Sequence, residues 1–324
     1  MNRLLIALIV VIGVPAATVL YVAAIEWLLA RMPSRRRAQW RPWLWFAPAG
    51  LLLLFYLVYP TINTIYLSFL NANSTAAVGF DNYRFAFTDP DMLIAFRNNL
   101  FWLIFFTTAT VVFGLVIAVL TDRVRYEAVA KALIFLPMAI SFVAAGVIWK
   151  LMYEFEPAGQ PQTGTINALL TTILPNFQPQ AWLFNRATNN AALIIIGIWM
   201  WTGYAMVILS AGLKSISNDL LEAARVDGAN EWQIFWGITI PILQSTIAVV
   251  TTTLIINVLK VFDIVYVMTN GNLDTEVIAN RMYKEMFNFR HFGRASAIAV
   301  ILLLAVIPVM VININRFREQ EALR

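Results

Sequence analysis

Seven long apolar stretches dominate the chain, and short polar or charged segments separate them. They cover about residues 4–30, 42–70, 99–121, 132–153, 191–212, 242–268 and 295–315. A helix needs roughly 20 mostly apolar residues to cross a bilayer, whereas a barrel strand is shorter and alternates apolar with polar positions. The pattern therefore predicts an all-α, polytopic membrane helical bundle of about seven spans. The first stretch is too long for a signal-peptide core, although a cleaved or merely accessory helix remains the alternative there.

Composition supports this prediction and excludes several kinds of chemistry. The chain is 60% hydrophobic and 13% charged, and a soluble protein this apolar could not cover its surface with polar groups. It has no cysteine, which excludes disulfides and thiol catalysis, and its one histidine, His291, leaves no histidine cluster for a metal. We interpret His291 as a polar surface residue. The net charge of +5 does not indicate nucleic-acid binding, because the basic residues lie in short segments between the stretches.

The basic residues predict the orientation, since Lys and Arg favour cytoplasmic loops. Alternate segments hold 13 of the 23 basic residues: Arg31, Arg35, Arg36, Arg37, Arg41, Arg123, Arg125, Lys131, Lys214, Arg225, Arg316, Arg318 and Arg324. We place these segments in the cytoplasm, which puts the N-terminus outside and the C-terminus inside. One outer segment runs against the rule, because it carries Arg281, Lys284, Arg290 and Arg294. The longer outer segments 71–98 and 154–190 either meet an external partner or only connect spans.

One polar segment, residues 222–243, has the pattern of two short amphipathic helices. Its sequence is EAARVDGANEWQIFWGITIPIL. Ser217 or Asn218 can cap the start of the first helix, and Gly228 can adopt a positive φ at little cost, which suits a turn. We expect the second helix to stop at Pro241. Apolar positions recur along both helices, at Leu220, Leu221, Ala224, Val226, Ala229, Trp232, Phe235, Trp236 and Ile238.

The same segment resembles the cytoplasmic signature loop of ABC importer permeases, and within them the carbohydrate-uptake branch of the maltose permease subunits. The resemblance covers roughly residues 42–318. "VFDIVYVMTNGN" and the long first helix look most like permeases for α-glucosides and glucosylglycerol. The matching positions are Glu222-Ala223-Ala224, Gly228, Ile240-Pro241-Ile242-Leu243, Pro60, Ser68-Phe69, Gly79-Phe80-Asp81-Asn82-Tyr83, Phe135-Leu136-Pro137, Trp149, Gly164, Asn167, Trp199, Phe262-Asp263, Phe292-Gly293 and Ala295-Ser296-Ala297.

Two departures from the family pattern affect how the chain is divided. Thr269-Asn270-Gly271-Asn272 lacks the further glycine and the proline that are frequent there, and many members lack the first helix. We divide the chain into an accessory N-terminal transmembrane helix with a basic cytoplasmic loop (1–41), an ABC permease domain (42–318) and a cytoplasmic tail (319–324).

The resemblance implies a function and a set of partners. It implies an ATP-driven importer in the bacterial inner membrane that moves a disaccharide, α-glucoside or glucosylglycerol into the cytoplasm by alternating access. The implied partners are a second homologous permease subunit, two ATP-binding cassette ATPase subunits and an extracytoplasmic solute-binding protein. The first helix of the segment would enter a cleft on an ATPase subunit. The coupling residues would be Glu222, Ala223, Ala224, Asp227, Gly228 and Pro241.

Three alternatives remain open. The segment is also typical of an amphipathic helix resting on the lipid surface. The cargo of an importer could instead be an ion, an amino acid or a polyamine. A membrane-embedded enzyme would need convergent catalytic groups, and the chain has neither these nor a G-x-x-x-x-G-K-[ST] phosphate loop. We therefore expect no catalytic residue, no metal and no cofactor in this chain, with ATP and Mg²⁺ used by the partner ATPase subunits.

Charged residues inside a span are costly and are candidates for function. Lys260 and Asp263 are three residues apart in the stretch 242–268, and Asn257 shares their predicted helix face. They could line a substrate path, or Lys260 and Asp263 could only neutralise each other.

Flat aromatic side chains beside hydrogen-bonding groups suit a sugar. Trp199, Trp201 and Tyr204 in the stretch 191–212, together with Phe262, are candidates for such surfaces, although Trp and Tyr also gather at membrane interfaces. A glycosidase would need two carboxylates fixed across a pocket. The closely spaced pairs Glu154 with Glu156 and Asp89 with Asp91 lack a basic or nucleophilic companion, so we reject that function.

Overall fold

The chain is a bundle of helices, as the apolar stretches predict. The computed structural model describes residues 3–122, 124–174 and 176–322, and the chain divides into two units, Met1–Tyr66 and Leu67–Arg324. The described residues form helices and, apart from one isolated bridge between Leu70 and Ala77, no β-structure. Six helices are long and apolar enough to cross a membrane, or seven if one bent pair counts as a span. The all-α polytopic fold is thus confirmed.

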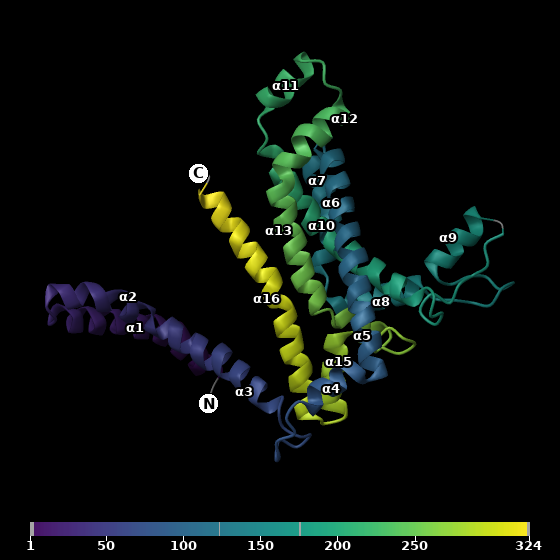
Figure 1. Cartoon of the computed structure of the whole chain (residues 1–324). Helices are drawn as coiled ribbons and strands as arrows, with labels where there is room; N and C mark the ends of the chain where they lie inside the picture. Colours follow the sequence, from purple (N-terminus) through teal and green to yellow (C-terminus); the bar gives the residue numbers. More distant parts are fainter. Residues whose placement is uncertain (1–2, 123, 175, 323–324) are drawn as a thin grey trace. The chain divides into compact units, whose positions relative to one another are not determined.

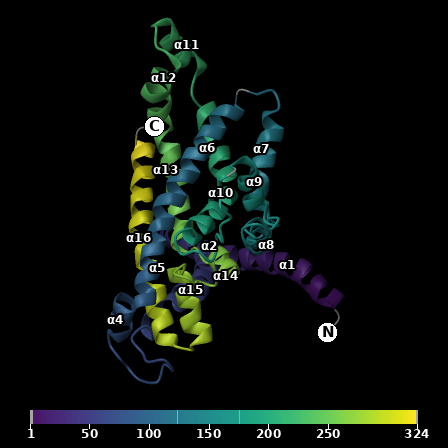
Figure 2. The same ribbon diagram turned by 90° about the vertical axis from the view of Figure 1, so that its right-hand side faces the viewer.

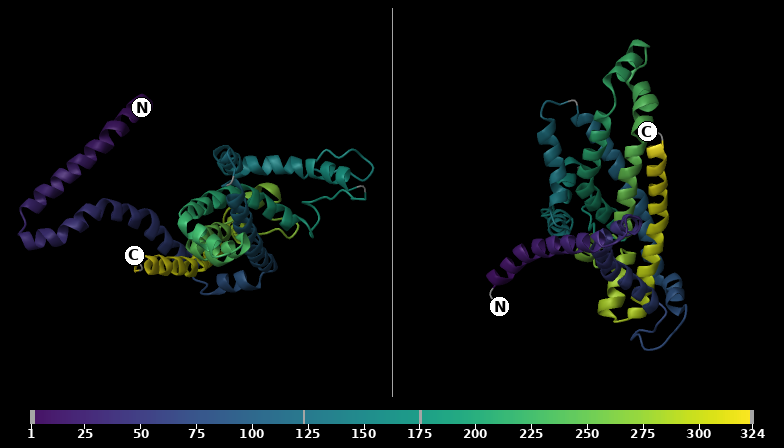
Figure 3. Two further views of the ribbon diagram at one scale, coloured as in Figure 1. Left: turned by 90° about the horizontal axis from the view of Figure 1, so that it is seen from above. Right: turned by 90° about the vertical axis from the view of Figure 1, so that its left-hand side faces the viewer.

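The first unit is a helical hairpin. α1 (Arg3–Ala30) is followed by α2 (Ser34–Leu53), which continues through a π-helical turn at Leu54–Val58 into α3 (Tyr59–Leu67). The hydroxyl of Tyr21 donates to the carbonyl of Leu44 at 2.5 Å, and the two helices diverge from their connecting turn (Figure 3). The prediction of a basic loop over 31–41 was wrong, because α2 begins at Ser34. Arginine is a good helix former, so a run of arginines does not end a helix.

α10 (Asn189–Lys214) is the centre of the second unit. In its most apolar window 61% of the residues are buried, and it packs against α6 (Thr107–Thr121), α7 (Glu127–Phe135) and α13 (Ile240–Leu259). A Cβ on Gly203 would lie 2.5 Å from the carbonyl oxygen of Ile134. Small residues allow membrane helices to approach this closely. α16 (Phe292–Ala322) packs against α13 (Figures 1 and 2).

Two predicted spans are interrupted. The stretch 132–153 is bent by 100° between Glu127–Ala139 and Phe142–Met152, the second of which is α8. The stretch 242–268 is not one helix, because α13 ends at Leu259, residues 260–262 are not helical, and α14 (Asp263–Met268) follows. Lys260 and Asp263 therefore do not share the face of a continuous helix, and that prediction was wrong.

Shorter helices lie at the ends of the bundle. At one end α11 and α12 project beyond the long helices, and α4 and α15 lie at the other (Figure 1). The segment 71–98 is more than a plain connection, because it contains α4 and most of α5. The bounds are α4 (Asp81–Thr88), α5 (Pro90–Phe101), α9 (Thr165–Ile173), α11 (Asn218–Val226), α12 (Glu231–Ile234) and α15 (Ile278–Tyr283), with π-helical turns at Trp102–Phe106, Phe235–Thr239 and Lys284–Asn288.

Candidate functional site

The first candidate site is the turn between α11 and α12. Gly228 has a φ of +89°, so its predicted left-handed conformation is confirmed. The N–H of Ala229 donates to the carbonyl of Ala224 and that of Gly228 to the carbonyl of Arg225, both at 3.0 Å. This is the Schellman pattern, which satisfies the last carbonyls of a helix and favours glycine at this position. Ser217 occupies the N-cap position of α11, but its side chain makes no capping hydrogen bond.

One ion pair joins α12 to α11. Across the turn, the guanidinium of Arg225 lies 2.8 Å from the carboxylate of Glu231. Within α12, Asn230 and Gln233 form a capping box, with both side chain-to-backbone hydrogen bonds at 2.9 Å. The capping box therefore fixes the start of α12, and the ion pair connects the two short helices.

Pro241 does not end the second helix, so that prediction was wrong. The helix continues from Glu231 to Leu259 over 29 residues. Pro241 stands in the first turn of α13, directly after the π-helical turn Phe235–Thr239. Such a turn changes the hydrogen-bonding register locally and lets a helix accept a residue that lacks an N–H.

Much of the surface of the turn is exposed. The residues expected to couple to a partner lie open: Glu222, Ala223, Asp227, Gly228 and Pro241 are exposed, and Ala224 is half-buried. Large apolar side chains are exposed beside them, with Val226 at 87% and Trp232 at 70% of full exposure. An exposed apolar surface of this kind on a rigid element is typical of a protein-docking site.

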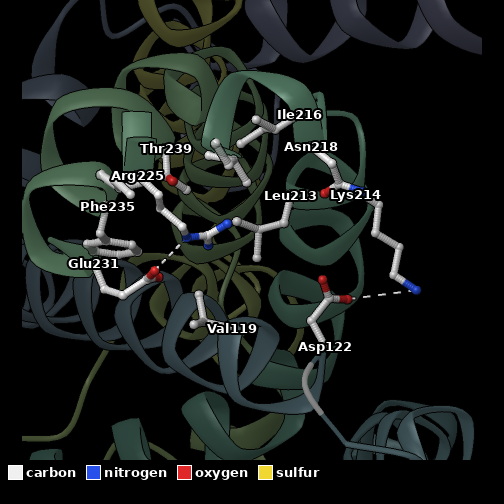
Figure 4. A pocket seen from close by; sticks show the side chains of 12 residues that line it. Val119, Asp122, Leu213, Lys214, Ile216, Asn218, Arg225, Glu231, Phe235 and Thr239 are labelled. Carbon is white, nitrogen blue, oxygen red and sulfur yellow. Dashed lines mark hydrogen bonds and ion pairs between the residues drawn. The ribbon is translucent and has the colours of Figure 1, made fainter. Parts of the chain in front are cut away.

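A cavity of about 360 Å³ separates this element from the ends of the long helices (Figure 4). Its charged residues include Arg225 and Glu231 on one side and Lys214 and Asp122 on the other, which lie 3.7 Å apart. Lys214 also pairs with Glu127 at 2.6 Å, and Lys131 contacts both Glu127 and Asp122. This ion cluster at the ends of α6, α7 and α10 was not predicted, because Lys214 is 83 residues away along the chain from the nearest of the other three members.

The second candidate site is the break between α13 and α14. A cavity of about 260 Å³ there is lined by Asn257, Lys260, Phe262, Asp263 and Trp201 among others. The structure therefore brings four of the six predicted substrate-path residues together. Among the described residues no ion pair joins Lys260 to Asp263, and both are exposed.

The other two predicted residues, Trp199 and Tyr204, are not in the lining of the cavity. Trp199 packs edge-on against Trp149, with ring centroids 5.7 Å apart, and Tyr204 packs edge-on against Trp201 at 5.6 Å. Trp102 does line the cavity, in the π-helical turn before α6. The indole N–H of Trp102 is buried and, among the described residues, makes no hydrogen bond, so this donor is unpaired within the described part of the chain.

Buried asparagines hold the irregular chain around this break. The side-chain oxygen of Asn99 accepts the N–H of Ile278 at 2.9 Å, and its amide donates to the carbonyl of Val258 at 3.4 Å. Asn98 donates to the carbonyls of Asp274 and Glu276 at 2.7 and 2.8 Å. The bonds to Ile278, Asp274 and Glu276 pair backbone groups of the segment before α15 and at its start, as irregular chain at membrane depth requires.

Two of the four basic residues that ran against the orientation rule are held in ion pairs. Arg281 pairs with Asp91 at 2.8 Å, Glu285 at 3.0 Å and Asp89 at 3.5 Å. Lys284 pairs with Glu276 at 2.7 Å. Asp89 and Asp91 are therefore engaged in an ion network. Glu285 is almost fully buried, and burial raises its pKa while the Arg281 guanidinium opposes that rise.

Among the described residues, no cluster of three or more histidine or carboxylate side chains could hold a metal ion. The geometry offers an exposed helical turn at one end of the bundle and a mixed polar and aromatic cavity at the α13–α14 break.

Comparison with known proteins gives consistent results. Residues 110–319 match the family described as "Binding-protein-dependent transport system inner membrane component". The chain is 60% identical over 281 residues to the osmoprotective compounds uptake permease protein GgtC of Synechocystis sp., covering 87% of this chain and all of that one. It is 47% identical to the alpha-glucoside transport system permease protein AglF of Rhizobium meliloti, covering 86% and 83% of the two chains.

A solved structure shares the fold. The match is to a chain of a bacterial ABC transporter involved in the import of the acidic polysaccharide alginate. Its TM-score is 0.74 at 22% identity, and it covers 88% of this chain and 99% of that chain.

The ion network around Arg281 makes a testable prediction. Arg281→Met leaves Glu285 buried without its closest cation, and breaking a buried pair costs about 3–5 kcal/mol. Because burial already raises the pKa of Glu285, this cost acts at neutral pH and fades as acid protonates the carboxylate. We expect thermal unfolding in detergent to show a large fall in Tm at pH 7.5 and a smaller fall at pH 5.

Arg186→Met is the matched control for that measurement. Arg186 pairs with Asp274 at 3.1 Å, but its side chain is 69% exposed, and exposed pairs contribute about 0–1 kcal/mol. Equal losses at both pH values for Arg281→Met, or equal losses in the two variants, would contradict the assignment.

Proposed function

The chain belongs to the family of binding-protein-dependent transport system inner membrane components, and we propose that its cargo is an α-glucoside or a glucosylated osmolyte such as glucosylglycerol. It is a multi-pass permease subunit of an ABC importer rather than an enzyme. Two relatives named for osmoprotective compounds and for alpha-glucosides support this cargo class.

The lining of the cavity at the α13–α14 break carries the proposal. Asn257 and the indole N–H of Trp102 supply hydrogen-bonding groups, and Phe262 and Trp201 supply flat apolar surfaces. Lys260 and Asp263 contribute one charge of each sign. A neutral polyhydroxylated solute matches this balance, whereas a polyamine would meet Lys260 without an excess of carboxylates to offset the repulsion.

We further propose that α11 docks on an ATPase subunit, with Glu222 and Ala223 at the contact and Gly228 setting the angle to α12. The exposed coupling residues and the rigid turn support this role. A single helix runs from Glu231, beside the turn, to Leu259, at the edge of the cavity. A movement of the turn would therefore be carried along α13 to the cargo site, as alternating access requires.

The full importer would contain a second, homologous permease subunit, two ATPase subunits that use ATP and Mg²⁺, and an extracytoplasmic solute-binding protein. Docking on an ATPase places the α11 end of the bundle in the cytoplasm. The C-terminus then lies inside, and the N-terminus of α1 lies outside.

Cargo uptake tests the proposed function. In a strain lacking the chromosomal gene, we expect the plasmid-borne gene to restore uptake of labelled glucosylglycerol or of an α-glucoside. Asp263→Ala should lower the apparent affinity for that cargo about tenfold or more, because hydrogen bonds to charged groups contribute about 1.5–3 kcal/mol. Glu154→Ala removes an exposed carboxylate outside this cavity and should leave uptake unchanged. Uptake of an amino acid or polyamine but of no glucoside would refute the cargo.

The turn at Gly228 makes a second prediction. Gly228→Val forces a β-branched residue to a φ of +89°, which costs on the order of 1–3 kcal/mol and shifts α11 from its docking angle. We expect assembly of the importer to persist, with ATP hydrolysis no longer stimulated by cargo and uptake reduced at least about fivefold.

Gly159→Val is the matched control for the turn variant. Gly159 also has a positive φ, +92°, with open space around its Cβ position, but it lies in the segment 154–190. The Gly159→Val substitution introduces the same kind of backbone strain at a position away from α11. Normal coupling in Gly228→Val, or equal loss in both variants, would refute the docking role.

A further inference from the structure

We propose that the tip of the α1–α2 hairpin, residues 27–43, binds the headgroup phosphates of anionic phospholipids. This surface lies within the first unit, outside both candidate sites, and is independent of the cargo.

The tip carries an excess of positive charge that the protein does not neutralise. Five arginines stand between residues 31 and 41, against one carboxylate, Glu26. Glu26 pairs with Arg37 at 3.5 Å and with Arg41 at 3.0 Å. Arg35 and Arg36 are exposed and, among the described residues, contact no carboxylate.

The length of the second helix places these arginines outside the hydrocarbon layer. The helix from Ser34 to Leu67 has 34 residues, which at 1.5 Å per residue is about 51 Å. The hydrocarbon core is about 30 Å thick, and even a tilt of about 40° leaves about 39 Å along the bilayer normal. The helix is therefore longer than the hydrocarbon core is thick. Because the rest of the helix is apolar, the part that extends beyond the core is its basic end, and the arginines reach the headgroup layer.

The order of residues along α2 follows the layers of a membrane surface. Arg36, Trp40 and Trp43 recur at helical spacing on one face, and the two tryptophans are 54% and 70% exposed. Trp45, by contrast, donates its indole N–H to Glu26 at 3.1 Å, on the side facing α1. The arginine would lie at the level of the lipid phosphates, the tryptophans at the membrane interface and the apolar residues that follow in the hydrocarbon layer.

The same belt extends onto α1. The guanidinium of Arg31 lies 3.3 Å from the centroid of the Trp27 ring, a cation–π contact that holds the arginine beside an exposed aromatic ring. Aromatic rings interleaved with arginines fit a lipid headgroup above acyl chains better than a free phosphate in water, since the rings need an apolar layer to cover them. The occupant is therefore a membrane lipid.

The test uses the purified full chain in detergent, titrated with phosphatidylglycerol or phosphatidylcholine and observed by native mass spectrometry. We expect phosphatidylglycerol to bind in preference, and Arg35→Ala with Arg36→Ala to weaken that binding about 30-fold. Arg35→Lys with Arg36→Lys should retain it, and added salt should weaken the wild-type binding.

Arg84→Ala with Lys150→Ala removes two exposed positive charges elsewhere and should leave phosphatidylglycerol binding unchanged. Equal binding of the two lipids would overturn the proposal. So would an unchanged affinity in the Arg35 and Arg36 alanine variant, or an equal loss in the Arg84 and Lys150 variant. If the alanine variant does not fold, the lysine variant and the salt dependence decide.

Discussion

The structure depends on satisfying backbone hydrogen bonds where a membrane helix is interrupted. Lipid offers no partner to a free N–H or carbonyl, so irregular chain at membrane depth must be paired within the protein. Here buried asparagines of α5 do this, since Asn99 joins the end of α13 to the start of α15 and Asn98 holds the segment between α14 and α15. The bonds of Asn99 tie the end of α13, directly before the break at residues 260–262, to the start of α15.

The same constraint explains which parts of the fold were predictable. Long apolar stretches and the turn at Gly228 have local signals, namely hydrophobic length and a residue that tolerates positive φ. The break after Leu259 has none, because its sequence contains neither glycine nor proline and its partner Asn99 lies 159 residues from Val258. The prediction that the helix stops at Pro241 was wrong because a π-helical turn directly before α13 accommodates the proline without ending the helix. Trp102 was missed because a tryptophan inside an apolar stretch looks like any lipid-facing or core residue.

One continuous helix leads from the first candidate site to the second. The Schellman turn and the Arg225–Glu231 pair connect α11 to α12, and α12 continues without interruption into α13 as far as the cavity. A docking surface at one end and a mixed polar and aromatic cavity at the other are what a subunit needs if energy from a partner is to move a solute. The small side chain of Gly203 allows α10 to pack directly against α7 in the bundle around this helix.

The absence of cysteine from the natural sequence allows a direct test of the central claim, that α11 docks on an ATPase subunit. A single cysteine at Ala223, which is exposed on α11, would be cross-linked with a short thiol-to-amine reagent in the assembled importer. We predict a product with an ATPase subunit, and none from a single cysteine at Lys150 on α8. Failure of Ala223→Cys to capture an ATPase subunit in a complex that hydrolyses ATP, or equal capture by Lys150→Cys, would contradict the account.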